Sequence, residues 1–187
     1  MTNLDILKTH HSLVLCEGTA EEVIFNKLYE AGELVIESGM LHDVTRTRGA
    51  RRIQEEYLNF HFDYPVYVVR LVDSVKERFA LTKLYSQRYP VLSFFTRPEI
   101  EMLVIIAEGQ AAAFRRKGGS NLKPSDYCVQ VLKYQNIKSR TFLDSYWDAD
   151  KLIQAIVEYK RIMNISKDEF CLADLLKEPR AALTRFQ

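Results

Sequence analysis

The sequence predicts an α/β fold: a mostly parallel sheet of about four strands, flanked by helices and followed by a helical C-terminal part. Three observations predict it. Short apolar runs rich in β-branched residues alternate with longer amphipathic segments. Two of these runs end in an acidic residue, at the position where open parallel sheets carry their functional groups. From about residue 125 onward the pattern is that of helices.

The first predicted strand is the apolar run at residues 13–16, after a short polar lead-in. Gly18 permits a sharp turn, and Thr19 is a suitable N-cap for a helix at about residues 20–31. Gly32 ends that helix. The chain is therefore expected to open with a strand, a turn and a helix.

The next segments predict a short strand, a loop, a helix and a longer strand. Residues 34–36 form the short strand, and the polar and basic residues 40–48 form the loop. The spacing of apolar residues predicts a helix at residues 49–60. Residues 66–72 contain no Gly or Pro and are rich in β-branched residues, which is typical of a core strand of a parallel sheet.

One further strand and several helices complete the pattern. A helix at about residues 76–87 precedes a strand at residues 91–95, and a long, largely apolar helix follows at residues 98–114. Residues 125–176 predict further helices. This order favours a parallel sheet with helices on both faces.

Acidic residues gather where the first strand ends. Glu17 directly follows the strand, and Glu21 falls in the first turn of the next helix, where a carboxylate also favours the helix dipole. Both side chains can point to one spot above the sheet edge, and two carboxylates there suggest a divalent metal site. The plain alternative is a strand followed by a well-capped surface helix.

The motif Glu-Gly-x-Ala-Glu that begins at Glu17 resembles the opening motif of Toprim domains, especially those of OLD-family nucleases and related phage-defence effectors. The resemblance covers about residues 13–108. It implies a Toprim-like (Rossmann-like) catalytic core at residues 1–115. The helical pattern of the later residues, which the resemblance leaves unassigned, predicts a mainly helical extension at residues 116–187 packed on that core. In these families the first glutamate serves metal binding or acid–base chemistry and the second can also serve the metal, which implicates Glu17 and Glu21.

The family pattern also asks for an acidic pair, usually Asp-x-Asp, after a second strand. Asp73 ends the strand at residues 66–72 and resembles the first Asp, which implies a catalytic and metal-binding role beside Glu17. Val75 stands in the place of the second Asp and cannot bind a metal, and Glu77 could substitute for it. The alternative role for Asp73 is an N-cap of the next helix.

A third acidic feature follows the strand at residues 91–95. Glu99 and Glu101 enter the first turn of the next helix, but at a spacing of two they point to different faces, so we do not expect both on one ion. Several Toprim-like defence nucleases carry a similar proline-and-glutamate helix start, and Glu101 most resembles its acidic residue. We therefore prefer Glu101 as the metal ligand, while Glu99 could serve the helix dipole.

Two basic stretches are candidates for contacts with nucleic-acid phosphates, which would make binding salt-dependent. The first follows the predicted second strand, and the second precedes a glycine-containing loop. The alternatives are a solvated helix face and a helix C-terminus that favours cations. The stretches are Arg46, Arg48, Arg51 and Arg52, and Arg115, Arg116 and Lys117.

The composition agrees with an intracellular enzyme domain. The 187 residues fit one domain, or one domain with a small appendage, and the net charge of +1 does not indicate a nucleic-acid binder. The three widely spaced cysteines indicate a reducing compartment. No signal peptide or membrane span is visible, so we expect a cytoplasmic protein. The absence of a Walker A sequence, a GxSxG elbow, a GxGxxG motif and zinc-ligand histidine spacing disfavours an ATPase, a serine hydrolase, a dinucleotide oxidoreductase and a zinc hydrolase.

With the resemblance, these residues predict a Mg²⁺- or Mn²⁺-dependent nuclease that cleaves DNA or RNA, including tRNA, as the effector of a prokaryotic anti-phage defence system. Proteins of this kind often act beside an ATPase, so the resemblance also implies an ATPase partner subunit. We expect no membrane partner, and a homo-oligomer stays open. Two alternatives remain: a catalytically inactive Toprim-like interaction or assembly subunit, which Val75 favours, and a small primase-like polymerase.

Overall fold

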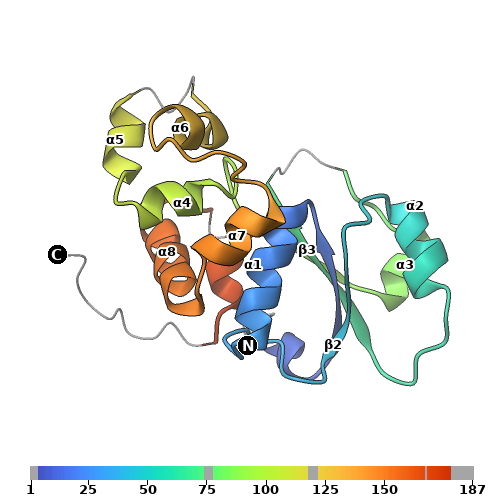
Figure 1. The fold of residues 1–187 in the computed structure, drawn as a ribbon. Coiled ribbons are helices and arrows are strands. Elements are labelled where there is room, and N and C mark those ends of the chain that lie inside the picture. Colours follow the sequence, from blue (N-terminus) through green and yellow to red (C-terminus); the bar gives the residue numbers. More distant parts are fainter. Residues whose placement is uncertain (1–3, 74–77, 118–121, 167, 178–187) are drawn as a thin grey trace.

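A five-stranded parallel sheet lies at the centre of the fold, with the strand order β2-β1-β3-β4-β5 (Figure 1). The computed structural model describes residues 4–73, 78–117, 122–166 and 168–177. The two apolar runs that end in acids are neighbouring strands inside the sheet, as the sequence predicts. The strands are β1 (His11–Cys16), β2 (Leu41–Thr45), β3 (Val66–Val72), β4 (Val91–Phe95) and β5 (Phe170–Cys171).

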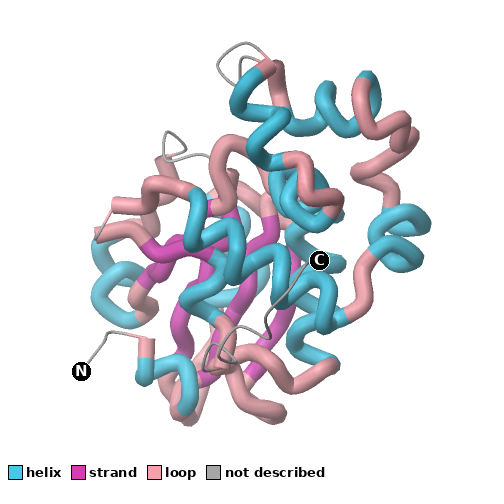
Figure 2. Tube along the Cα trace, turned by 90° about the vertical axis from the view of Figure 1, so that its left-hand side faces the viewer, coloured by secondary structure: helices cyan, strands magenta, loops and turns pink. Residues whose placement is uncertain are grey.

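Helices cover both faces of this sheet. Helices α1, α4, α7 and α8 lie on one side and α2 and α3 on the other (Figure 1). After a 90° turn, the strands run side by side behind the helices of the larger layer (Figure 2). Among the described residues, no helix is both long and apolar enough to cross a membrane. The helical elements are η1 (Asp5–Lys8), α1 (Thr19–Glu30), α2 (Ala50–Ile53), η2 (Gln54–Leu58), α3 (Lys83–Arg88), α4 (Met102–Ala107), α5 (Ala111–Arg116), α6 (Pro124–Gln130), α7 (Arg140–Tyr146), α8 (Ala149–Ile162) and η3 (Leu172–Leu175).

Alternate residues of the central strands enter two separate cores. Val14 and Val69 face the larger layer, where they join Ile156 of α8 in one apolar cluster. Leu13 and Val68 point the other way, into a smaller cluster that includes residues of α2 and η2. This alternation is the period of two expected for a strand buried on both faces. Because α8 shares the larger core with the sheet, the C-terminal helices help to hold the central strands in place.

The second strand is not where the apolar run predicts it. Residues 34–36 are buried, but Leu34 makes only an isolated antiparallel bridge to Leu176, so the predicted strand is wrong. The predicted loop at residues 40–48 contains β2, which pairs with β1. The reason is physical: β2 is an edge strand with mostly half-exposed residues, so it needs no apolar run, whereas Leu34 is apolar because it packs in the core.

Three helix predictions differ from the structure, and two are confirmed, one of them the helix at about residues 20–31, which is α1. The long helix predicted at residues 98–114 begins at Met102 and is interrupted between α4 and α5, where Gly109 adopts a positive φ of 66°. Within the described part of residues 76–87, only α3 from Lys83 onward is helical. The predicted all-helical region 125–176 also contains β5, whose two residues are too few for a recognisable pattern. The helix predicted at residues 49–60 is confirmed as α2 continuing into η2.

A candidate acidic site at the carboxyl edge of the sheet

The candidate site begins where β1 and β3 end side by side. The ladder pairs Cys16 with Leu71, so Glu17 and Asp73 both follow the last rungs of neighbouring strands. The Asp73 backbone N–H donates a hydrogen bond to Oε2 of Glu17 over 2.8 Å. The Glu17 backbone N–H in turn donates to the carbonyl of Leu71 over 3.2 Å. The parallel ladder therefore places two acids, 56 residues apart in the chain, at one edge of the sheet.

Helix α1 brings a third carboxylate to this edge. Glu21 lies in its first turn and is only 6% exposed. A Cβ at Gly18 would lie 3.3 Å from Oε2 of Glu21, so the glycine leaves the room that this carboxylate occupies. Burial, together with the smaller effect of the nearby charges of Glu101 and Glu17, raises the pKa of Glu21 to about 7. Glu21 is thus a carboxyl group that takes up a proton near neutral pH.

The carboxylates of Glu17, Glu21, Asp73 and Glu101 line one cavity of about 260 Å³. Burial, followed by the charge of Glu17, raises the pKa of Asp73 to about 6. Burial also raises the pKa of Glu101, which is 4% exposed. Since several acids, two of them buried, share this cavity, the site favours binding of protons or cations. The cavity is lined by Glu17, Gly18, Thr19, Ala20, Glu21, Arg48, Asp73, Ile100, Glu101 and Lys138.

Two cations flank the acids. Arg48 donates from Nε to the Glu17 backbone carbonyl over 2.8 Å, donates to the same oxygen from Nη2, and places Nη1 3.7 Å from Oε1 of Glu17. Lys138 Nζ lies 3.4 Å from Oε1 of Glu101. Partial burial lowers the pKa of Lys138, but the carboxylates of Glu101 and Glu99 outweigh it and leave the pKa raised. Lys138 thus stays protonated beside the acids.

The donor set suits a hard divalent cation in kind, but it is not assembled as a coordination shell. Carboxylate oxygens are the side-chain ligands that Mg²⁺ and Mn²⁺ prefer. Among the residues that the structure describes, no group of three or more His, Cys, Asp or Glu side chains is arranged to hold a metal ion. Glu17 is engaged by the Asp73 amide and Arg48, and Glu101 by Lys138. A metal would therefore have to draw these carboxylates together and compete with the two cations.

The other acidic candidates divide between this cavity and other roles. Glu101 lines the cavity, as preferred from the sequence. Glu99 instead accepts a hydrogen bond from the backbone N–H of Ser125 at the start of α6, over 3.0 Å. Glu77 and Val75 lie outside the described residues, so the structure does not place them.

Of the basic residues proposed from the sequence, Arg48 lines the acidic cavity and the others lie outside it. Arg46 lies beside the first turn of α1, with Nη1 donating to Thr19 Oγ1 over 3.1 Å and Nε 3.5 Å from Oε2 of Glu22. Arg51 and Arg52 instead form exposed ion pairs with the glutamates four residues along. Neither group lines the acidic cavity, and neither do the three residues at the end of α5. Those three are Arg115, Arg116 and Lys117.

Two basic residues near the site carry no signal in the sequence. Lys138 lies in the connector before α7, and Arg140 begins α7. Arg140 Nη2 lies 2.6 Å from Oε2 of Glu22, the same carboxylate oxygen that faces Arg46. The packing of α7 against α1 brings them here. No local motif could have shown it.

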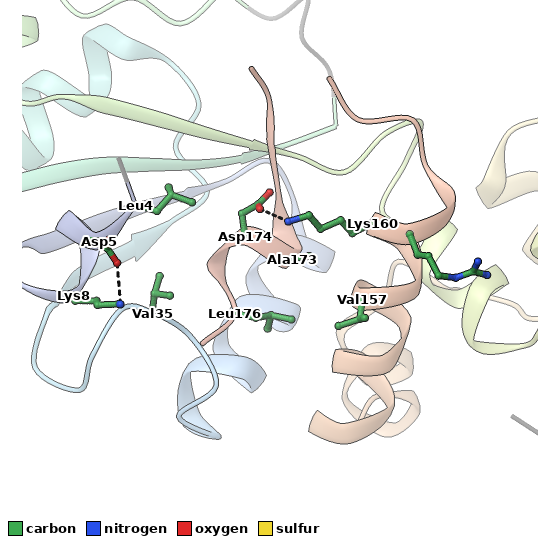
Figure 3. Close-up of a pocket in the computed structure, with 10 residues that line it drawn as sticks. Leu4, Asp5, Lys8, Val35, Val157, Lys160, Ala173, Asp174 and Leu176 are labelled. Atoms are coloured by element: carbon green, nitrogen blue, oxygen red, sulfur yellow. Dashed lines mark hydrogen bonds and ion pairs between the residues drawn. The ribbon is translucent and has the colours of Figure 1, made fainter. Parts of the chain in front are cut away.

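A cavity larger than the acidic one lies elsewhere in the described structure (Figure 3). It has a volume of about 510 Å³ and lies between η1, α8 and η3. Its charged groups are paired within the protein, Lys8 with Asp5 at 2.9 Å and Lys160 with Asp174 at 2.5 Å. Because these charges offset one another, the acidic cavity is the better candidate for chemistry despite its smaller volume.

Comparison with protein-family models, curated proteins and solved structures finds no match to this chain.

Proposed function

We propose that the chain is a metal-dependent nuclease whose reaction centre is the acidic cavity. One observation carries this proposal: Glu17, Glu21, Asp73 and Glu101 line a single cavity at the carboxyl edge of a parallel sheet. Open α/β sheets bind their ligands at this edge. Carboxylates with strongly raised pKa values in a cleft are typical of functional sites.

Mg²⁺ or Mn²⁺ would be held by Glu17 and Asp73 together with Glu21 or Glu101, and would supply charge stabilisation and a more acidic bound water. Glu17 is oriented for this task, since the Asp73 amide fixes one of its oxygens. Glu21, with a pKa of about 7, is suited to accept the proton that an attacking water loses.

The flanking cations supply the contact with substrate. Arg48 and Lys138 line the cavity on either side of the acids and can neutralise the phosphodiester that approaches them. Arg46 and Arg140 lie just outside, both held by Glu22. The substrate strand would pass over the start of α1 between these two pairs of cations. The sequence resemblance supports the further proposal that the chain is a defence effector beside an ATPase.

The second candidate is a catalytically inactive interaction or assembly subunit with the same fold. A specific observation favours it: the described residues contain no ready coordination set, and Val75 stands where a second acid is expected.

Cleavage assays separate the two functions. Supercoiled plasmid, single-stranded DNA and tRNA are incubated with the protein in Mg²⁺ or Mn²⁺, and Glu17→Gln and Asp73→Asn are compared with the surface control Glu55→Gln. We expect metal-dependent cutting of at least one substrate, a loss of 100-fold or more in the two site variants, on the order of removing one key electrostatic group, and normal cutting by the control. Cutting that persists in both site variants contradicts the nuclease proposal, and an inert wild type supports the inactive subunit.

A further inference from the structure

A second cavity adjoins the acidic one, and Lys138 is the wall between them, since it lines both. This second cavity has a volume of about 330 Å³, at the small end of the range for ligand sites. It is built from α6 and the connector that leads to α7. Its lining residues are Ser125, Asp126, Val129, Asn136, Ile137, Lys138 and Ser139.

The polar groups in this cavity include two that are available to a ligand. The side chains of Asp126 and Asn136 make no hydrogen bond or ion pair among the described residues. The Ser139 hydroxyl, by contrast, is used as the N-cap of α7, where it accepts from the Phe142 backbone N–H over 3.2 Å. Both residues are exposed where they line this cavity, so the carboxylate and the amide can receive donor and acceptor groups of a small planar ligand.

The backbone holds Asn136 in place for this role. Asn136 has a positive φ of 54°, and its carbonyl accepts a hydrogen bond from the Ser139 backbone N–H over 2.7 Å. This tight turn fixes the direction in which the Asn136 side chain leaves the connector. Val129, with 48% of its surface exposed, and the buried Ile137 add an apolar wall. The cavity therefore combines polar edges with an apolar face.

We propose that this cavity binds an unpaired nucleobase next to the scissile phosphate, with preference for a base that carries an exocyclic amino group. The proposal rests on the proposed nuclease function and adds the substrate class: a strand whose bases are not paired at the cleavage point. A phosphate at Lys138 would stand between the acids and the second cavity, so its neighbouring base would reach Asp126 and Asn136. The Asp126 carboxylate accepts from an amino group, as carboxylates do with cytosine, and the base face lies on Val129.

Binding of short oligonucleotides tests this without cleavage. Fluorescence anisotropy measures the affinity for oligo-dC, oligo-dT and a blunt duplex of equal length, with Ca²⁺ in place of Mg²⁺. We expect oligo-dC to bind about tenfold more tightly than oligo-dT, which lacks an amino group, in line with one carboxylate–base pair. The duplex should bind more weakly than oligo-dC.

Two variants remove the recognition by different means. Asp126→Ala deletes the carboxylate, and Asn136→Gly deletes the amide while keeping a residue that accepts the positive φ. Each should reduce the preference for oligo-dC to about twofold or less and leave oligo-dT binding unchanged. Asp144→Ala, an exposed aspartate outside both cavities, is the matched control and should retain the preference.

The outcomes separate this inference from the nuclease function. Equal affinity for oligo-dC and oligo-dT, a preference that survives both variants, or no binding of either strand overturns the base site. If cutting in Mg²⁺ depends on Glu17 but is the same for all bases and is unchanged in both variants, the nuclease function is supported and the base site is not. If both variants abolish the base preference but the wild-type protein cuts no substrate, the base site is supported and the nuclease function is not.

Discussion

The carboxylate of Glu17 accepts a hydrogen bond from the backbone amide of Asp73, with Oε2 and N 2.8 Å apart. The bond joins the ends of β1 and β3 and turns one oxygen of Glu17 toward the second acid. Because of this closeness, the charge of Glu17 adds to burial in raising the pKa of Asp73 to about 6. The two acids therefore behave as one electrostatic unit.

The metal-free protein is expected to lose stability as the pH rises from 5 to 8. Glu21 has a pKa of about 7 in the folded protein against an ordinary value of 4.5, so the folded state binds its proton more tightly. The cost of ionising buried Glu21 is absent below pH 4.5 and fully present above pH 7, where it amounts to about 3 kcal/mol at most. Melting temperatures in EDTA measure this. Glu21→Gln should remove most of the difference, and a wild type that is more stable at pH 8 than at pH 5 would contradict the burial of a titrating Glu21.

Mn²⁺ should raise the melting temperature of the wild type at neutral pH. The folded protein gathers four carboxylates in one cavity, whereas the unfolded chain disperses them, so the ion binds the folded state preferentially. Glu17→Gln and Asp73→Asn should lose this response, and Glu55→Gln, in an exposed ion pair with Arg51, should keep it. A response of equal size in all four proteins would place the metal elsewhere.

Glu108→Ala should destabilise the protein by about 2 kcal/mol, measured by urea unfolding. Glu108 Oε1 accepts hydrogen bonds from the hydroxyls of Tyr146 at 2.6 Å and Tyr134 at 3.0 Å, and it lies 3.9 Å from Lys151 Nζ. Its removal leaves two half-buried hydroxyls without this acceptor. Glu158→Ala breaks only a surface pair with Arg161 and should cost less than about 1 kcal/mol. Equal losses for the two variants would show that the tyrosine contacts contribute nothing.

Thr96→Val should stabilise the fold by about 1 kcal/mol. Thr96 is 2% exposed, and its hydroxyl has no hydrogen-bond partner among the described residues. Valine keeps the shape and removes a buried polar atom that costs free energy. Thermal and urea unfolding provide the measurement, and Thr96→Ser, which keeps the hydroxyl, serves as the control. A less stable Thr96→Val protein would mean that the hydroxyl has a partner in solution, such as a bound water.

The interior strands could be predicted because burial on both faces leaves a mark in the sequence. β3 reads as an unbroken apolar run except for Arg70, whose guanidinium lies over the Phe79 ring, 4.4 Å from its centroid. β2, at the edge, has no such requirement and was not predicted. Its position depends on pairing with β1, which no local pattern encodes.

The acidic half of the candidate site could likewise be predicted, and the basic half could not. Glu17 and Asp73 are recognisable because each directly follows a strand, and parallel strands end at the same edge. Lys138 can be recognised as part of the site only from the folded structure. It lies there because α7 packs against α1, more than a hundred residues away in the chain. Arg51 and Arg52 are the opposite case: they are conspicuous in the sequence but lie outside the site. Each is paired with a glutamate four residues along the chain, Glu55 or Glu56.

The placement of Lys138 has a consequence for synthesis. The ribosome synthesises the chain from the N-terminus to the C-terminus. Glu17, Asp73 and Glu101 therefore emerge long before Lys138. Until the connector and α7 have emerged, the nascent chain carries a group of acids without that counter-charge, and α8 is not yet there to cover the sheet. A chain interrupted before this point would expose an apolar face of the sheet to chaperones.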